Sequence, residues 1–352
     1  MKRAKSFLAL VGVATCLSWL TLASAEDEQQ QPQAAAPDAG AAAADTSSPD
    51  GAASDAPAAP VKPKPAEIMP LASQGLLLDI VNTGERLVAV GDHGDIVASI
   101  NGKDWAQAEV PVRAPLTAVY FIDAKSGWAV GHDATILHTT DGGRTWTLQN
   151  FQPELEKPLL DVYFLDNQHG FAVGAYGMLK ETLDGGQSWS DVKNAIAEAE
   201  LHLNSIIRLG NGDLFIAGEQ GTLALSTDQG KTWTKLGSPY EASLFGALAI
   251  GDHGAMIYGL RGNIFVTQDV RSNKWSKIDT GNVSTMFGGT RLSDGRLAMV
   301  GLNGVIWLTD ANGGNIKRVT GTVGTTQSAV VGFKGGLLMV GESGVQVVPN
   351  VQ

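Results

Sequence analysis

A short polar stretch, Thr139-Thr140-Asp141-Gly142-Gly143-Arg144-Thr145-Trp146, recurs along the chain and is its strongest structural pattern. It returns with little change at residues 182–189 and 226–233, and each copy ends in a tryptophan. Weaker copies end in Trp105 and Trp275, so that the five tryptophans are 41, 43, 44 and 42 residues apart. A fixed period near forty residues indicates one supersecondary unit repeated along the chain.

A second pattern runs in phase with the tryptophans: a β-rich run, a glycine, two variable residues and usually another glycine. The first glycine occurs seven times, at positions Gly91, Gly131, Gly174, Gly218, Gly259, Gly301 and Gly341. Two β runs joined by such a short, glycine-bounded link indicate a tight hairpin. Each unit divides into four short strands, which the second unit places at 116–122, 127–130, 135–139 and 145–149.

Four antiparallel strands repeated seven times predict an all-β protein, a seven-bladed β-propeller with four-stranded antiparallel blades. The runs lack the 3.6-residue period that helical repeats require. The seventh unit has no sequence for a fourth strand after Pro349. We predict that the segment Glu67–Leu71 supplies this strand and closes the ring in the last blade, because closure leaves no unpaired strand there. Pro70 is acceptable in such an edge strand.

The N-terminus has the pattern of a secretory signal peptide. Lysine and arginine residues precede an apolar run at 7–22, and Ala23-Ser24-Ala25 follows it. We predict a signal peptide at 1–25 with cleavage after Ala25, and a periplasmic or otherwise exported protein. A lipoprotein anchored at Cys16 and an uncleaved anchor are the alternatives, but Thr15 is a poor residue before a lipidated cysteine. No other stretch is apolar enough for a transmembrane span, so the mature chain is predicted to have none.

Residues 26–66 are rich in alanine, proline and scattered acids, and this composition predicts a disordered linker. The propeller is assigned to 67–352. The net charge of −11 disfavours nucleic acid as a partner. Cys16 is the single cysteine, which excludes a disulfide framework and a cysteine metal site in the propeller.

The repeated polar stretch has a structural interpretation. Its aspartate accepts hydrogen bonds from the backbone of its own turn, its glycine adopts a positive φ, and its tryptophan buries a large ring. We assign this role to Asp141, Gly143, Trp146, Asp184, Gly186, Trp189, Asp228, Gly230 and Trp233. The alternative, that the three aspartates are catalytic or bind calcium, requires convergence on one site, and peripheral turns on separate blades do not converge.

These stretches resemble the Asp-box repeats of sialidases, sortilin-type receptors and other propellers. The combination of Trp128-Ala129-Val130-Gly131 with the box at 139–146 most resembles the photosystem II stability/assembly factor family, as does 170–174 with the box at 182–189. The resemblance covers roughly residues 75–348. It implies an exported, non-enzymatic, seven-bladed propeller without a cofactor, which assists the assembly of a membrane or envelope protein complex. Family members have an arginine-rich patch, whereas here Arg208, Arg261, Arg291, Arg296 and Arg318 are scattered over three blades.

The variable residues of the glycine pattern are the candidate partner-binding site, since the turns between second and third strands all lie on one face. The candidates are Asp92, His93, His132, Asp133, Tyr176, Glu219, Gln220, Arg261, Asn303 and Glu342. These residues are equally well explained as ordinary polar turn residues. The aspartates and histidines at 92–93 and 132–133 are possible metal ligands, but adjacent blades diverge, so no metal site is predicted. The links at 151–158 and 191–202 are the longest and offer further contact points.

Two other functions remain open. A sialidase-like glycoside hydrolase needs an arginine cluster, a tyrosine with a carboxylate partner and an acid in the channel. The sequence has only five tyrosines and lacks the Phe/Tyr-Arg-Ile-Pro stretch typical of sialidases. The third possibility is a glycan-binding propeller without catalysis. The leading prediction is a monomeric protein-binding propeller.

Overall fold

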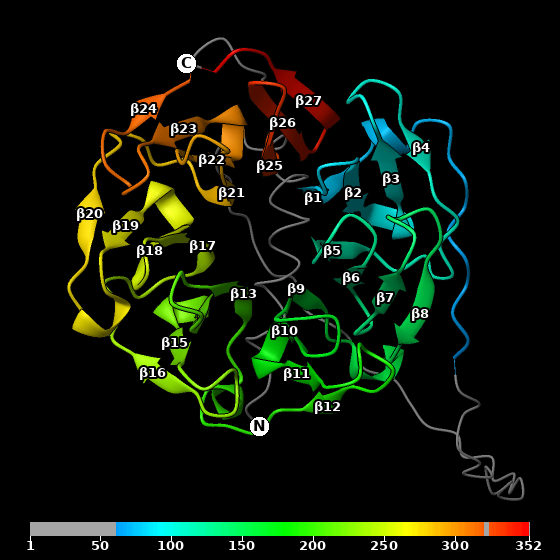
Figure 1. Cartoon of the computed structure of the whole chain (residues 1–352), viewed down its shortest axis with the longest axis horizontal. Helices are drawn as coiled ribbons and strands as arrows, with labels where there is room; N and C mark the ends of the chain where they lie inside the picture. The colour runs from blue at the N-terminus through cyan, green and yellow to red at the C-terminus, as the bar shows by residue number, and fades with distance from the viewer. Residues whose placement is uncertain (1–60, 320–323, 352) are drawn as a thin grey trace, which may run out of the picture. The chain divides into compact units, whose positions relative to one another are not determined.

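Each repeat folds into one antiparallel sheet, and seven sheets surround a central channel (Figure 1). The structure is a computed structural model that describes residues 61–319 and 324–351. The sheets confirm the predicted all-β, seven-bladed propeller. The predicted signal peptide at 1–25 and most of the predicted linker at 26–66 lie outside the described residues.

The strands of each blade follow one another in chain order from the channel outward. The first three blades consist of β1 (Leu77–Asn82), β2 (Leu87–Gly91), β3 (Ile96–Ser99) and β4 (Ala106–Gln107); β5 (Leu116–Phe121), β6 (Gly127–Gly131), β7 (Ile136–Thr139) and β8 (Thr147–Asn150); and β9 (Leu159–Phe164), β10 (Gly170–Gly174), β11 (Leu179–Thr182) and β12 (Ser190–Asp191).

The remaining blades consist of β13 (Leu203–Arg208), β14 (Leu214–Gly218), β15 (Leu223–Ser226) and β16 (Thr234–Leu236); β17 (Leu244–Ile250), β18 (Gly254–Gly259), β19 (Ile264–Thr267) and β20 (Ser276–Ile278); β21 (Met286–Arg291), β22 (Leu297–Gly301), β23 (Ile306–Thr309) and β24 (Lys317–Arg318); and β25 (Gln327–Phe333), β26 (Gly336–Gly341) and β27 (Gly344–Val348). In the described part of the chain, the helical segments are short 3₁₀ turns: η1 (Ala72–Gln74), η2 (Asp92–Gly94), η3 (Pro153–Leu155), η4 (Ala175–Gly177), η5 (Ala197–Ala199), η6 (Glu219–Gly221), η7 (Leu260–Gly262), η8 (Val270–Ser272) and η9 (Leu302–Gly304).

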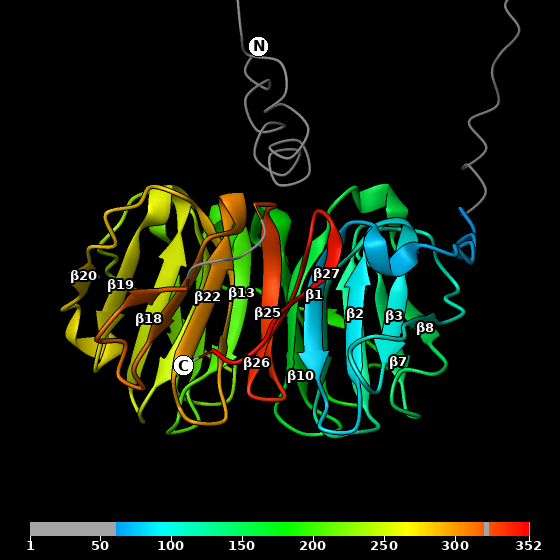
Figure 2. The same cartoon turned by 90° about the horizontal axis from the view of Figure 1, so that it is seen from above.

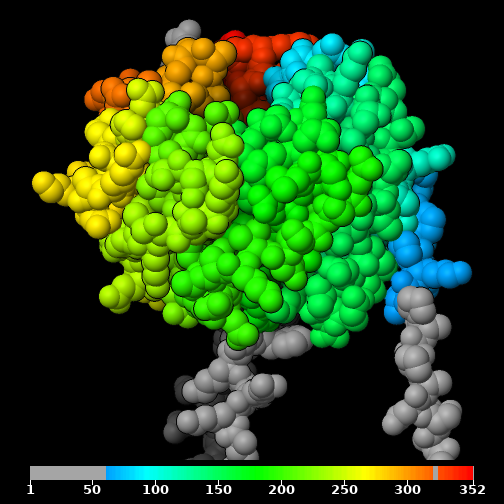
Figure 3. Space-filling view, turned by 60° about the horizontal axis from the view of Figure 1, so that its bottom comes forward, coloured from blue at the N-terminus to red at the C-terminus, as the bar shows by residue number. Residues whose placement is uncertain are grey.

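The core lies between neighbouring blades. Every residue of the second strand is buried in all seven blades, because both faces of that strand are covered by adjacent sheets. Between the first two blades, for example, Val88 and Val90 pack with Leu137 of β7 and with the ring of Trp146. The surface of adjoining blades is continuous in Figure 3. The outermost strands β12 and β24 are exposed.

The predicted closing strand is not present. Glu67–Leu71 forms no strand in the structure, and the last sheet has three strands among the described residues. Instead, this segment lies against the outer edge of the first blade: the Met69 N–H donates to Gln107 Oε1 at 2.7 Å, and Gln107 Nε2 donates to the Glu67 carbonyl. The prediction was wrong because the side chain of Gln107 satisfies these backbone groups locally.

The ring is closed by side-chain packing and by η1. Leu77 and Val97 of the first blade pack with Val331 and Leu338 of the last blade in one buried cluster. The segment around Ser73 packs against the last blade in the way that the link between two successive blades packs against the first of them. A Cβ added at Gly344 would lie 2.1 Å from the Ser73 carbonyl oxygen, just as one added at Gly94 would lie 2.2 Å from the carbonyl oxygen of the link that follows the first blade. The N-terminal segment therefore closes the ring as a link rather than as a strand.

None of the described residues forms a helix that is long and apolar enough to cross a membrane.

Candidate functional site

The predicted partner-binding residues lie in the turns between second and third strands. In Figure 2 the second strand β2 runs toward the end of the molecule that carries these turns, and β1 runs away from it. We call this end, with the links between blades, the turn face. Exposed side chains on it include His93, Gln220, Arg261, Asn303 and Glu342.

Hydrogen bonds hold each of these turns in one place. In all seven blades the first turn residue donates its N–H to the carbonyl of the residue just before the innermost strand; the donors are residues 92, 132, 175, 219, 260, 302 and 342. The second turn residue has a positive φ in six blades, including 56° at His93 and 55° at Tyr176. This left-handed backbone is costly for residues other than glycine or asparagine and points each side chain in a fixed direction.

Most of the predicted residues stay apart, one or two to a blade, but a cluster forms between the third and fourth blades. The ring of Tyr176 meets the ring of His202 edge-on, with centroids 5.0 Å apart, and Lys157 Nζ lies 5.6 Å above the tyrosine ring. Glu219 Oε2 accepts the His202 N–H at 3.1 Å. Burial lowers the pKa of His202, and the nearby charge of Glu219 opposes that shift. Sequence reasoning missed Lys157 and His202, although both end the long links that it had singled out.

Burial lowers the pKa of His132, and the charges of Asp133 and of Asp92 in the neighbouring blade oppose this shift without cancelling it. In the described residues, no group of three or more His, Cys, Asp or Glu side chains is placed to hold a metal ion.

The three Asp boxes lie at the other end of the strands. Thr182 Oγ1 donates to Asp184 Oδ1 at 2.8 Å, and the Gly186 N–H donates to Thr182 Oγ1 at 2.8 Å. Hydrogen bonds from the Ser188 hydroxyl and N–H lower the pKa of Asp184 to about 2. The boxes at Asp141 and Asp228 repeat these contacts, while Trp146, Trp189 and Trp233 pack between blades.

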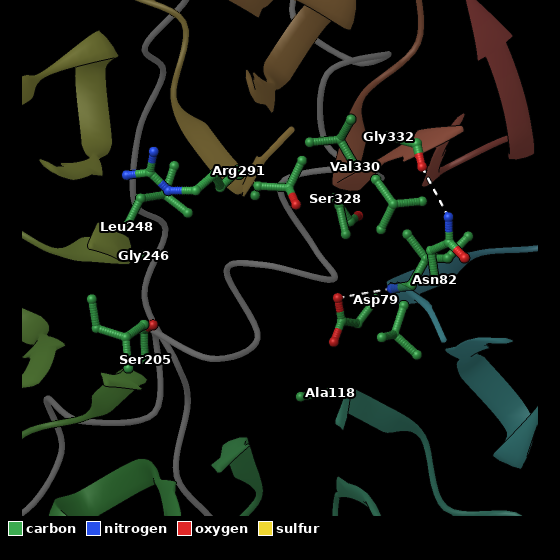
Figure 4. A pocket seen from close by; sticks show the side chains of 18 of the residues that line it. Asp79, Asn82, Ala118, Ser205, Gly246, Leu248, Arg291, Ser328, Val330 and Gly332 are labelled. Carbon is green, nitrogen blue, oxygen red and sulfur yellow. Dashed lines mark hydrogen bonds between the residues drawn. The ribbon is translucent and has the colours of Figure 1, made fainter. Parts of the chain in front are cut away.

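The central channel has a volume of about 1070 Å³. All seven innermost strands line it, and Figure 4 shows the carboxyl group of Asp79 among small and apolar side chains. The third residue of each innermost strand forms a ring that we call the channel waist: Asp79, Ala118, Asp161, Ser205, Gly246, Gly288 and Ala329. Small residues therefore occupy five blades, and carboxyl groups occupy the first and third.

The two waist carboxylates connect neighbouring blades. Asp79 accepts the N–H of Ile80 at 2.8 Å and that of Val119 in the next blade at 2.9 Å. Asp161 accepts the N–H of Val162 and that of Ile206, both at 2.8 Å. Burial raises the pKa of Asp79 to about 7 and that of Asp161 to about 6, against an ordinary value of 3.8. Sequence reasoning missed both residues because it looked for partner-binding residues in the turns and not within the strands.

One mouth of the channel is predominantly cationic. Arg208, Arg291, Arg296 and Lys334 line it together with one carboxylate, Asp294, which pairs with Arg296, so three of the arginines that looked scattered in the sequence are gathered by the fold. Arg291 donates to the Ala249 carbonyl of the fifth blade, and Arg296 donates to the Val351 carbonyl at 2.9 Å. These guanidinium groups therefore also join adjacent blades.

Tyr258 brings a phenol to the same channel. Its hydroxyl passes between the innermost strands of the fifth and sixth blades, where a Cβ at Gly246 would lie 2.3 Å from it and one at Gly289 3.0 Å. Burial, with the charges of Asp161 and Asp79, raises the pKa of this phenol. A raised pKa keeps the proton on the phenol, so its hydroxyl can donate a hydrogen bond.

Comparison with known proteins agrees with this architecture. The family model described as photosynthesis system II assembly factor YCF48 matches residues 97–155 and 149–341. The chain belongs to this family. The photosystem II assembly protein Ycf48 of Thermosynechococcus vestitus is 36% identical over 50 residues, which are 14% of each chain. The chloroplastic photosystem II stability/assembly factor HCF136 of Guillardia theta is 39% identical over 61 residues, 16% of this chain and 15% of that protein.

The aligned segments thus span only about a seventh of each of these relatives. A solved structure of YCF48 bound to D1 peptide superimposes with a TM-score of 0.64 at 18% identity, covering 84% of this chain and 99% of that one. At this identity the superposition supports the propeller fold. Family membership comes from the sequence match, and the partner of this protein has to be argued separately.

Proposed function

We propose that this protein is an exported, non-enzymatic propeller that binds a segment of a membrane or envelope protein and assists the assembly of its complex. Its membership of the YCF48 family supports the assembly role, and one solved relative is bound to a peptide. The observation that carries the binding site is the turn face. Seven turns, each locked by the same backbone hydrogen bond, hold varied side chains in fixed directions. Such a surface loses little conformational entropy on binding.

The cluster of Lys157, Tyr176, His202 and Glu219 is the proposed centre of this surface. It combines an aromatic ring with a cation and a carboxylate, and residues of this kind are enriched where binding energy concentrates. The ring of Tyr176 is in contact with the ring of His202 and with the Lys157 ammonium group. We expect Tyr176→Ala to weaken partner binding about thirtyfold or more, since hot-spot truncations cost about 2 kcal/mol or more.

Site-specific photo-crosslinking in the native host tests this proposal. A photoreactive residue is placed at the exposed turn-face positions Gln220 and Asn303, and the matched controls carry it at Gln187 and Lys231, exposed in the Asp boxes at the other end. We expect the turn-face positions to capture a membrane or envelope protein and the control positions to capture none. Capture of no such protein from either face, with the propeller folded, would refute the proposal.

Export is tested independently. Fusion of residues 1–66 to a reporter enzyme that is active only outside the cytoplasm is expected to give activity. Deletion of the apolar run at 7–22 is expected to abolish that activity while leaving the amount of fusion protein unchanged. Activity that survives the deletion would contradict export by this segment.

The channel contains the kinds of group that a glycoside hydrolase uses, and this alternative has to be weighed. Carboxyl, phenol and guanidinium groups all line it. The raised pKa of Tyr258 opposes nucleophilic attack, and Arg291 is already bonded to two carbonyl oxygens. We therefore favour binding without catalysis. Release of product from fluorogenic glycosides by the wild type, lost in Asp161→Asn, would reverse this choice.

A further inference from the structure

The channel waist contains a polar group that the fold leaves without a partner. Tyr258 is 3% exposed, and none of the described residues forms a hydrogen bond with its hydroxyl. Two glycines make room for this phenol, because a side chain at Gly246 or Gly289 of the flanking innermost strands would meet its hydroxyl. A buried hydroxyl normally has a partner, so this one, which faces the open channel, is available to bond water or a ligand that displaces the water.

Aromatic side chains lie on either side of the waist. Each innermost strand has irregular pairing between its first and third residues, and the second residue of two strands is a phenylalanine. Phe245 and Phe287 both line the channel, with ring centroids 5.5 Å apart. On the other side of the waist, Tyr120 and Tyr163 form a second pair with centroids 5.0 Å apart. All four rings are partly exposed, so their faces are available for stacking.

The charges of the lining favour an uncharged ligand. The Asp79 and Asp161 carboxyl groups at the waist disfavour an anion, and the cationic mouth disfavours a cation. Both sets of groups offer hydrogen bonds nonetheless. Each carboxylate oxygen of Asp79 and Asp161 accepts one backbone N–H and keeps a further lone pair. Arg291 carries more N–H donors than its two hydrogen bonds to carbonyl oxygens use. A ligand with many hydroxyl groups satisfies donors and acceptors together and stacks its C–H faces on aromatic rings.

We propose that the central channel binds a neutral oligosaccharide, with Tyr258, Asp79 and Asp161 contacting its hydroxyl groups at the waist and the two aromatic pairs stacking on its rings. This site is separate from the turn face and does not depend on the assembly role. The volume of about 1070 Å³ is at the upper end of the range for small-molecule sites and accommodates several sugar rings.

The test uses the full mature chain and three probes: maltotriose, cellotriose and triacetylchitotriose. Saturation-transfer NMR detects binding, and calorimetry measures its affinity. We expect at least one probe to bind. Tyr258→Phe removes only the hydroxyl group and is expected to weaken binding about fivefold to tenfold, and Phe245→Leu is expected to do the same by loss of stacking. Tyr240→Phe is the matched control, because the Tyr240 hydroxyl bonds the Leu260 carbonyl and does not line the channel.

Binding that is lost in Tyr258→Phe and kept in Tyr240→Phe supports the proposal. Absence of binding of all three probes at millimolar concentration, with circular dichroism showing a folded protein, overturns it. Equal binding by Tyr258→Phe and wild type also overturns it, as does preferential binding of a charged probe such as lysine or succinate. None of these results bears on crosslinking from the turn face, so the two proposals fail separately.

Discussion

The waist carboxylates make stability depend on pH in an unusual direction, and Asp79→Asn tests this. The folded protein holds the Asp79 proton up to a pKa of about 7, whereas the unfolded chain releases it near 3.8. Between these values the folded state binds more protons than the unfolded state. Stability from this group is therefore full below about pH 4 and is lost as the pH rises through 7.

The size of the effect follows from the shift. A displacement of about three pKa units corresponds to about 4 kcal/mol over the whole range. Between pH 5 and pH 8 the linkage relation gives a loss of about 2.5 kcal/mol in the free energy of unfolding, as an upper limit. Because Asp79 faces a channel that admits water, we expect about 1–2.5 kcal/mol. Asp161, with a pKa of about 6, acts in the same direction.

Asparagine has nearly the same shape and does not titrate, so it removes the pH dependence of this one group. It also replaces one acceptor with a donor, which costs about 1–2 kcal/mol at every pH. We expect the wild type to lose more stability than Asp79→Asn when the pH is raised from 5 to 8. Urea unfolding followed by tryptophan fluorescence measures both proteins, and the comparison cancels all other titrating groups.

The control is Asp294→Asn, at an exposed position where hydrogen bonds from Arg296 lower the pKa. It should show the wild-type dependence between pH 5 and 8. If Asp79→Asn also follows the wild type across this interval, the assignment of a raised pKa to the waist is wrong.

Three further substitutions test the framework by thermal or urea unfolding. Asp141→Ala leaves the turn of its box without its acceptor and should cost about 1–2 kcal/mol; the exposed Arg144→Ala should cost less than half of that. Gly344→Ala places a methyl group on a residue with φ of 66° and against the Ser73 carbonyl oxygen. It should lower the free energy of unfolding by about 2 kcal/mol or more, and an unchanged stability would exclude η1 as the closing link. Trp128→Ala removes a side chain that is 1% exposed and stacked on the ring of Phe164. It should lower the free energy of unfolding by about 3–5 kcal/mol, and a loss below about 1 kcal/mol would contradict this packing.

Much of the fold could be predicted because its determinants are local. A box such as 139–146 contains its own acceptor, donors and positive-φ glycine, and all its contacts lie within the same few residues. The closing strand at 67–71 could not be predicted in this way. The conformation of this segment depends on two contacts that the sequence pattern does not show. Gln107 accepts the Met69 N–H, and the Ser73 carbonyl lies against Gly344 in the last blade.

Likewise, only the parts of the candidate site that form within one hairpin could be predicted from the sequence. The turn residues could be listed from their repeat positions, since each turn forms within its own hairpin. The cluster around Tyr176 combines two turns with two links, and the grouping of Arg208 with Arg291 brings together residues 83 positions apart. Proximity of this kind depends on how blades are placed around the axis.

By itself, the sequence determined the number of blades, the strand order within each and the residues that stabilise each turn. These properties follow from backbone preferences and hydrogen bonds that act over a few residues. Only the tertiary structure decided that two aspartates and a tyrosine meet in the channel and that, among the described residues, the seventh blade has no outer strand. Both outcomes depend on desolvation and contact between blades, which arise only once the ring has closed.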